Sequence, residues 1–135
     1  MTGEGRDLFL GVGVDREASA EEVRALALAA LAKARLAADA VVCVASIDLK
    51  SGEPAVQNLG RDLGVPVQFF SAARLEAETP RLANPSEVVF RKVGCHGVAE
   101  AAALAAAGAA GILVVPKIKS AHATLAVARA GRRLS

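Results

Sequence analysis

The chain has 135 residues, which suits one compact domain, and its 53% hydrophobic and 22% charged residues exclude an intrinsically disordered protein. A net charge of +2 and an aromatic content of 3% argue against a nucleic-acid-binding protein, which needs a basic surface or aromatic side chains for base stacking. The polar N-terminus lacks a signal-peptide core, and no apolar stretch approaches the roughly 20 residues of a membrane span. We therefore expect one cytoplasmic domain over residues 1–135, with its core at about 7–130 and with reduced cysteines.

The first third of the chain predicts a strand, a helix and a second strand. Residues 8–14 form an apolar run that is typical of a strand. Ser19 then opens a helix, and Glu22 three residues later completes a capping box. Residues 40–46 are apolar throughout, which predicts a central strand that is covered on both faces.

The middle of the chain predicts two helices around a third strand. Pro54 is typical of a first helical turn, and Gly64 ends the helix that it begins. Residues 65–70 form a short strand, after which Ser71 caps a brief helix.

Residues 84–92 fit two structures. Asn84 as N-cap, Pro85 in the first turn and Glu87 as the capping glutamate predict a helix to about residue 92. The apolar run at 88–90 would suit a strand equally well. We favour the helix, because the capping pattern is specific and the apolar run is short.

The last third predicts a helix over 97–107 and strands over 111–115 and 123–129, joined by a polar, basic loop at 116–122. Alternating strands and helices are typical of a layered α/β domain. We predict three layers, α/β/α, with a central sheet of about five strands. The sheet is expected to be mostly parallel, and a mixed sheet is the alternative.

Short motifs also occur in an order and spacing that resemble those of the CobE and CbiG C-terminal domain family over residues 7–130. They are Gly11-Val12-Gly13, Ser46–Lys50, Glu53-Pro54, Phe69-Phe70, Pro85-Ser86-Glu87, Gly94, Val98–Leu104, Lys117-Ile118-Lys119 and Thr124–Arg129. The chain departs from the family in its first loop, where Val14-Asp15-Arg16 replaces the usual Cys-Arg-Arg, and at Gly97, where Ser is usual. No role of the first-loop cysteine is therefore carried over.

This resemblance implies a function in building the corrin ring of vitamin B12. Proteins similar to CbiG open a lactone on a cobalt-precorrin and release acetaldehyde, whereas a chain holding only this domain resembles the free-standing CobE form. We expect an accessory or carrier protein that binds a precorrin or corrinoid intermediate, with other corrin-pathway enzymes as further candidate partners. The alternative is a hydrolase-type enzyme that acts on the same intermediate. We expect neither a cofactor nor a metal, and we expect no nucleic-acid or membrane partner.

Corrin intermediates are flat, apolar macrocycles that carry acetate and propionate groups, so a binding site for them needs cations or N–H donors at its rim. Ligands of open α/β sheets bind beyond the carboxyl ends of the strands. Basic residues, glycines and a threonine lie at the predicted strand ends and in the loops that join them, and these are our candidate substrate-binding residues. They are Gly11, Gly13, Arg16, Lys50, Lys117, Lys119 and Thr124. The alternative is that the cations are simply solvated loop residues.

The segment Gly94-Cys95-His96-Gly97 directly precedes a predicted helix. Free N–H groups at a helix N-terminus attract carboxylates, so Gly94 and Gly97 are further candidate binding residues. The same field would lower the pKa of Cys95, and His96 lies beside it, so one interpretation is a Cys95 nucleophile activated by His96. We favour the alternative, an ordinary turn with a cap. Glu100 is interpreted as the capping glutamate of the helix, with a general acid as the minority alternative.

Overall fold

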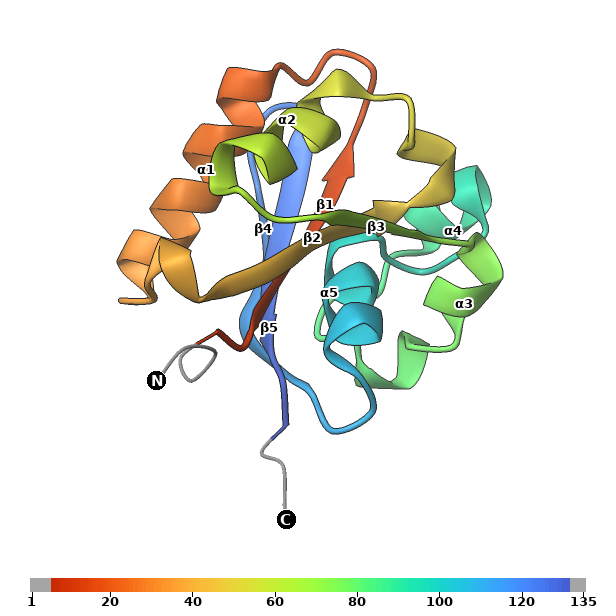
Figure 1. Ribbon diagram of the computed structural model, residues 1–135. Helices are drawn as coiled ribbons and strands as arrows, with labels where there is room; N and C mark the ends of the chain where they lie inside the picture. Colours follow the sequence, from red (N-terminus) through yellow and green to blue (C-terminus); the bar gives the residue numbers. More distant parts are fainter. Residues whose placement is uncertain (1–5, 132–135) are drawn as a thin grey trace.

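Five strands form one sheet in the computed structural model, which describes residues 6–131 (Figure 1). They are β1 (Leu8–Val14), β2 (Val41–Ile47), β3 (Val67–Phe70), β4 (Ile112–Lys119) and β5 (Ala123–Arg129), in the order β3-β2-β1-β5-β4. The pairs β1–β2 and β2–β3 are parallel, whereas β5 is antiparallel to both of its neighbours, β1 and β4. All strands except β5 therefore point the same way, which confirms a mostly parallel, mixed sheet.

Helices cover both faces of this sheet (Figure 1). α1 (Ala20–Lys33) and α2 (Pro54–Leu63) lie on one face, and α3 (Ala72–Glu76), α4 (Glu87–Val93) and α5 (Ala99–Ala107) lie on the other. Short 3-10 turns occupy Ala38–Ala40, Asp48–Lys50 and Thr79–Arg81 in the connections. The predicted three-layer α/β/α arrangement is confirmed. No helix within residues 6–131 has the length and apolar character needed to cross a membrane.

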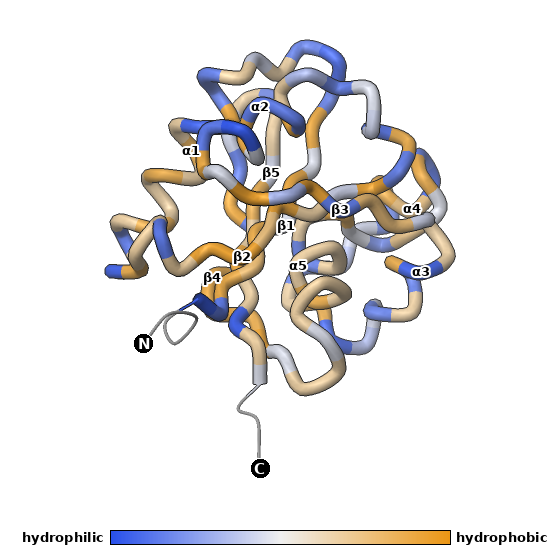
Figure 2. The backbone as a smooth tube through the Cα atoms, viewed as in Figure 1, coloured by the Kyte–Doolittle hydropathy of each residue, from blue (hydrophilic) through white to orange (hydrophobic). Residues whose placement is uncertain are grey.

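The two faces of the sheet pack differently because their side chains differ in size. Under α1 and α2 the core consists largely of Leu and Val side chains from β1, β2 and β5. Under α5 it consists mainly of alanines, and α5 itself contributes several. Figure 2 shows the central strands as the most hydrophobic part of the backbone, whereas hydrophilic residues gather in the outer connections.

Glycine in β1 brings α5 close to the sheet. A Cβ atom at Gly11 would overlap the carbonyl oxygen of Ala99, in the first turn of α5. At Gly13 it would lie 2.6 Å from Thr124 Oγ1 and 3.4 Å from Val98 Cβ. The backbones of β1 and α5 therefore approach more closely than any larger residue at position 11 allows.

The predicted caps are confirmed in part. Ser19 Oγ accepts a hydrogen bond from the Glu22 N–H at 3.0 Å, but the Glu22 carboxylate bonds to Ser120 and His122 instead of completing the capping box. The helix favoured for 84–92 is present as α4, but its N-cap is Ser86, whose Oγ accepts from the Val89 N–H at 3.2 Å. Asn84 is not the cap, since its amide groups are bound to Glu100.

β4 is longer than the sequence pattern predicts. It continues to Lys119, so the expected loop at 116–122 shrinks to residues 120–122. The pairing with β5 places Val115 opposite Val127 and Ile118 opposite Leu125, so Pro116 and Lys117 together face a single residue of β5. This is a β-bulge in an edge strand, where proline is tolerated because its missing N–H leaves no central ladder bond unmade.

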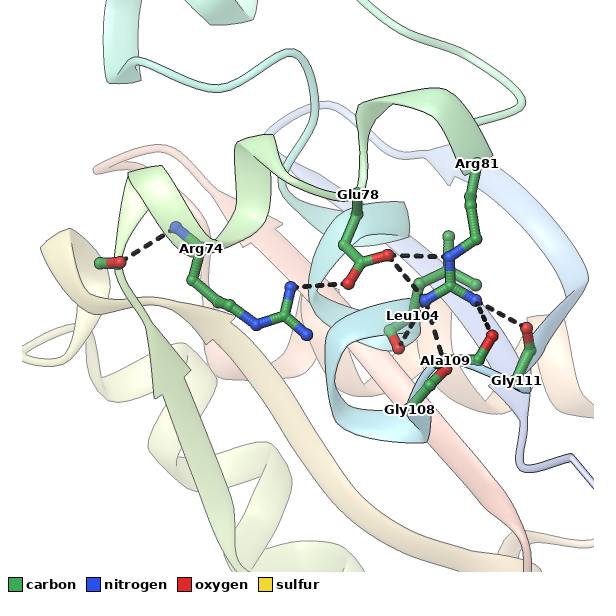
Figure 3. A network of polar contacts seen from close by, with 8 residues as sticks. Arg74, Glu78, Arg81, Leu104, Gly108, Ala109 and Gly111 are labelled. Atoms are coloured by element: carbon green, nitrogen blue, oxygen red, sulfur yellow. Dashed lines mark hydrogen bonds and ion pairs between the residues drawn. The ribbon is translucent and has the colours of Figure 1, made fainter.

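The C-terminal end of α5 is fixed by an ion-pair network around the buried Glu78 (Figure 3). Arg81 donates hydrogen bonds to the carbonyl oxygens of Leu104, Gly108, Ala109 and Gly111, at 2.9 to 3.4 Å. Glu78, whose side chain is 8% exposed, pairs with Arg81 and Arg74, each at 2.6 Å. The guanidinium group thus binds carbonyl groups at the end of α5 and in the turn after it, where the partial negative charge of the helix lies.

Candidate functional site

The carboxyl ends of β1, β2 and β4 lie at one edge of the sheet, because these strands point the same way. Arg16, Lys50 and Lys119 follow or end these strands and gather at this edge, as the sequence predicted. Arg16 and Lys119 are exposed and Lys50 is half-buried. Within residues 6–131, none of the three forms an ion pair with a carboxylate. We call these three side chains the cationic rim.

A polar network beside the cationic rim ties the β4–β5 turn to the loop after β1. His122 Nδ1 lies 2.9 Å from Asp15 Oδ2, and the His122 N–H donates to Glu22 Oε2 at 2.7 Å. The pKa of Asp15 is lowered chiefly by its hydrogen bond with His122, with a small contribution from the charge of Lys50. The network could not be predicted from the sequence, because its members are up to 107 residues apart.

Three other predicted residues lie inside the fold, and two of them are next to the cationic rim, since Thr124 pairs with Lys119 and with Gly13. Gly11 and Gly13 are buried against α5, and Thr124 is half-buried with Oγ1 3.5 Å from the carbonyl oxygen of Gly13. Their positions bring α5 and β5 against the end of β1. They shape the edge of the sheet from within.

Glu100 is a buried structural carboxylate, which corrects its interpretation as a capping glutamate. α5 begins at Ala99, with Val98 as an N-cap that has no capping side chain. The Glu100 side chain is 2% exposed and accepts hydrogen bonds from the Lys117 N–H at 2.8 Å and from both amide groups of Asn84 at 2.9 Å. Burial alone would raise the pKa of Glu100, but these hydrogen bonds outweigh it and lower the pKa. A carboxyl group that stays ionised and fully bonded is unsuited to act as a general acid.

Cys95 and His96 make separate contacts within the fold. Cys95 is fully buried, with Sγ 3.5 Å from the carbonyl oxygen of Gly97, and burial raises its pKa. This corrects the expected lowering, because desolvation of a thiolate outweighs the helix field. His96 instead stacks on Phe90, with ring centroids 4.3 Å apart, and its Nδ1 lies 2.9 Å from Glu76 Oε2.

The chain's own Glu76 occupies the backbone site that we expected to bind an anion. The His96 N–H donates to Glu76 Oε1 at 3.0 Å. Gly94 ends α4 with a φ of 87°, a left-handed conformation that suits glycine, and Gly97 is buried against Leu82. The turn at 94–97 thus joins α4 to α5, and its backbone binds the half-buried carboxylate of Glu76.

The geometry can be set beside known proteins. The family model for the cobalamin synthesis G C-terminus matches residues 8–128. The chain belongs to this family. It is 53% identical over 127 residues to Protein CobE of Sinorhizobium sp., which covers 94% of this chain and 82% of that protein. It is 30% identical over 121 residues to the cobalt-precorrin-5A hydrolase of Priestia megaterium, which covers 90% of this chain but 32% of the hydrolase.

Solved structures agree with this assignment. The crystal structure of CobE, a protein from the cobalamin (vitamin B12) biosynthetic pathway, matches with a TM-score of 0.84 and 40% identity, over 90% of this chain and 89% of that one. The crystal structure of cobalamin biosynthesis protein chiG from Agrobacterium tumefaciens matches with a TM-score of 0.71 and 28% identity, over 93% and 99%. The family resemblance inferred from the ordered motifs is confirmed, and so is the α/β fold.

Proposed function

We propose that the chain binds a polycarboxylate precorrin or corrinoid intermediate of cobalamin biosynthesis, as an accessory or carrier protein. The observation that carries this proposal is the cationic rim: three basic side chains from different strand ends lie along one edge of the sheet without carboxylate partners within residues 6–131. The acetate and propionate groups of a corrin are suited to such cations. Ligand binding beyond the carboxyl ends of strands is also typical of open α/β sheets.

Binding without catalysis is favoured by two further observations. The candidate reactive groups are engaged in the fold, since Cys95 is buried with a raised pKa and Glu100 is saturated with hydrogen bonds. The chain also spans most of Protein CobE but only about a third of the cobalt-precorrin-5A hydrolase. The hydrolase-type function remains the alternative, supported by that partial match. A cytoplasmic location is part of the proposal, supported by two free thiols at Cys43 and Cys95.

The proposal is tested by titrating the protein with hydrogenobyrinic acid while the visible spectrum of the corrin is followed. Arg16→Ala, Lys50→Ala and Lys119→Ala are each expected to weaken binding by about threefold to tenfold, because each removes one charge-assisted contact. Each should also reduce the salt dependence of the affinity. Lys92→Ala is the matched control, because Lys92 is an exposed lysine on α4, outside the cationic rim.

Two results would contradict the proposal. One is a spectrum that does not change on titration of the wild-type protein, and the other is an equal loss of affinity in Lys92→Ala and the three rim variants. Incubation with a precorrin that carries the lactone, followed by mass spectrometry of the recovered ligand, separates the two functions. An unchanged mass supports a binding protein, and a mass change that requires active protein supports the hydrolase.

A further inference from the structure

A groove runs between the C-terminal half of α1 and the edge strand β4, with a volume of about 380 Å³. Ala30, Lys33 and Ala34 line it from α1. The other wall is the segment 114–118 of β4, which includes Lys117. Lys117, predicted in a loop, lies in β4, and Lys33 lies in the last turn of α1, so the fold brings together two lysines that are 84 positions apart.

The bulged edge strand and the small side chains of α1 together explain why the groove is open. β4 is the last strand of the sheet, and α1 packs more closely over β5 than over β4, so the outer part of β4 is only partly covered. Alanines at positions 30 and 34 leave space where larger side chains would reach β4. The bulge at Pro116 and Lys117 shifts the strand out of register with β5.

The groove has the chemistry of a site for an apolar anion. Its floor is aliphatic, from Val114, Val115 and Ile118, and its charged lining residues are two lysines with no carboxylate among them. Within residues 6–131, neither Lys33 nor Lys117 forms an ion pair. Ligand sites of a few hundred Å³ that combine an apolar lining with a few convergent polar groups are typical of small-molecule binding.

β4 connects this groove to the cationic rim. Lys117 lines the groove, and Lys119, two residues further along the same strand, belongs to the rim. A large, flat ligand with carboxylates around its margin can therefore contact both.

We propose that the groove between α1 and β4 receives the apolar body of the polycarboxylate macrocycle, with Lys33 and Lys117 each binding one carboxylate. This inference rests on the proposed function, and it adds a location and two binding residues to it.

Paired variants on α1 test the location. Ala34→Glu places a carboxylate at the groove and is expected to weaken hydrogenobyrinic acid binding by about tenfold, through repulsion of the ligand's carboxylates. Ala32→Glu is the matched control, because Ala32 is exposed in the last turn of the same helix but does not line the groove. Thermal melting of both variants checks that they fold alike. Equal affinity of the two variants would overturn the proposal.

Lysine footprinting distinguishes failure of the groove from failure of the proposed function. The wild-type protein is acetylated with and without hydrogenobyrinic acid, and each lysine is quantified by mass spectrometry. Protection of Lys33 and Lys117, with Lys92 unprotected, is the expected result. Protection of Lys50 and Lys119 alone would overturn the groove and leave the proposed function standing. No protected lysine, together with an unchanged corrin spectrum, would overturn both.

Discussion

The two ends of α5 are fixed in opposite ways. Near its N-terminus the buried Glu100 carboxylate accepts hydrogen bonds from the N–H groups of Asn84 and Lys117. At its C-terminus the Arg81 guanidinium donates to four carbonyl oxygens and pairs with Glu78. Each charged group has the sign opposite to the partial charge of the helix end near which it lies: the carboxylate is at the positive N-terminus and the guanidinium at the negative C-terminus. Both charged groups are thus engaged within the fold.

This comparison separates structural charges from binding charges. Glu100 lies close to Lys117, yet its oxygens are fully engaged, whereas Lys119 and Arg16 are exposed and free of ion pairs within residues 6–131. A charged residue at the carboxyl edge of the sheet is therefore a binding candidate only if its charged group is not already bonded to other residues of the protein.

The largest expected effect is at the closest contact between α5 and the sheet. Gly11→Ala should lower the free energy of unfolding by about 3 kcal/mol or more, because the new Cβ would overlap the carbonyl oxygen of Ala99 and neither backbone can yield easily. Urea denaturation followed by circular dichroism measures it. Gly52→Ala is the control, because a Cβ there meets no atom within 4 Å. Similar stability of the two variants would show that α5 can move away from β1.

At the C-terminal end of α5, Arg81→Ala should lower the free energy of unfolding by about 2 to 3 kcal/mol. It leaves the carbonyl groups at the end of α5 without this donor, and it leaves the nearly buried Glu78 with Arg74 as its remaining arginine partner. Arg74→Ala removes an arginine from the same carboxylate but touches none of the α5 carbonyls, so its expected loss is about 1 kcal/mol. Equal losses in urea denaturation would mean that Arg81 acts through Glu78 alone.

Part of this architecture follows from the sequence. Strand and helix periodicity predicts the layers, and the rule for strand ends predicts that Arg16, Lys50 and Lys119 share an edge, because it depends only on strand direction. The ends of α5 could not be predicted in this way. Glu100 meets residues 16 and 17 positions away, and Arg81 meets residues 23 to 30 positions away. No local spacing rule encodes such pairs.

The groove escaped prediction for a related reason. It depends on the bulge in β4, and the basic, proline-containing segment at 116–119 resembles a loop when only local composition is considered. Cys95 was misjudged because its position before a helix is visible in the sequence, whereas its complete burial is decided by packing from α3 and α5.

At the N-terminal end of α5, Glu100→Gln should lower the free energy of unfolding by about 1 to 2 kcal/mol. The amide keeps one acceptor oxygen, but its NH2 group would face the N–H donors of Asn84 or Lys117. Glu21→Gln is the control, because Glu21 is exposed on α1 and forms no ion pair within residues 6–131. The lowered pKa of Glu100 adds a second readout, since its contribution is present above its ordinary pKa of 4.5 and is lost as the pH falls through the lowered value. The acid part of the stability profile should flatten in Glu100→Gln.

The smallest expected effect is a pH dependence from His96, in the turn that leads into α5. Its hydrogen bond with Glu76 is the main reason that the pKa of His96 lies above its ordinary value of 6.5. The stabilisation that protonated His96 contributes is therefore fully present below about pH 6.5, and it is lost as the pH rises through the raised pKa of His96. The same hydrogen bond lowers the pKa of Glu76, so stabilisation from that carboxylate is also lost as the pH falls through a value below 4.5.

Urea denaturation at a series of pH values tests the His96–Glu76 pair. We compare His96→Asn with His122→Asn, because His122 is the only other histidine in the chain and its pKa is also raised. The His96 side chain is 18% exposed and that of His122 is 35% exposed, so His96→Asn should remove the larger share of the decline above pH 6.5. A decline that survives both substitutions would exclude both histidines as its source. A larger effect at His122 would move the pH-sensitive contact from the approach to α5 to the turn beside the cationic rim.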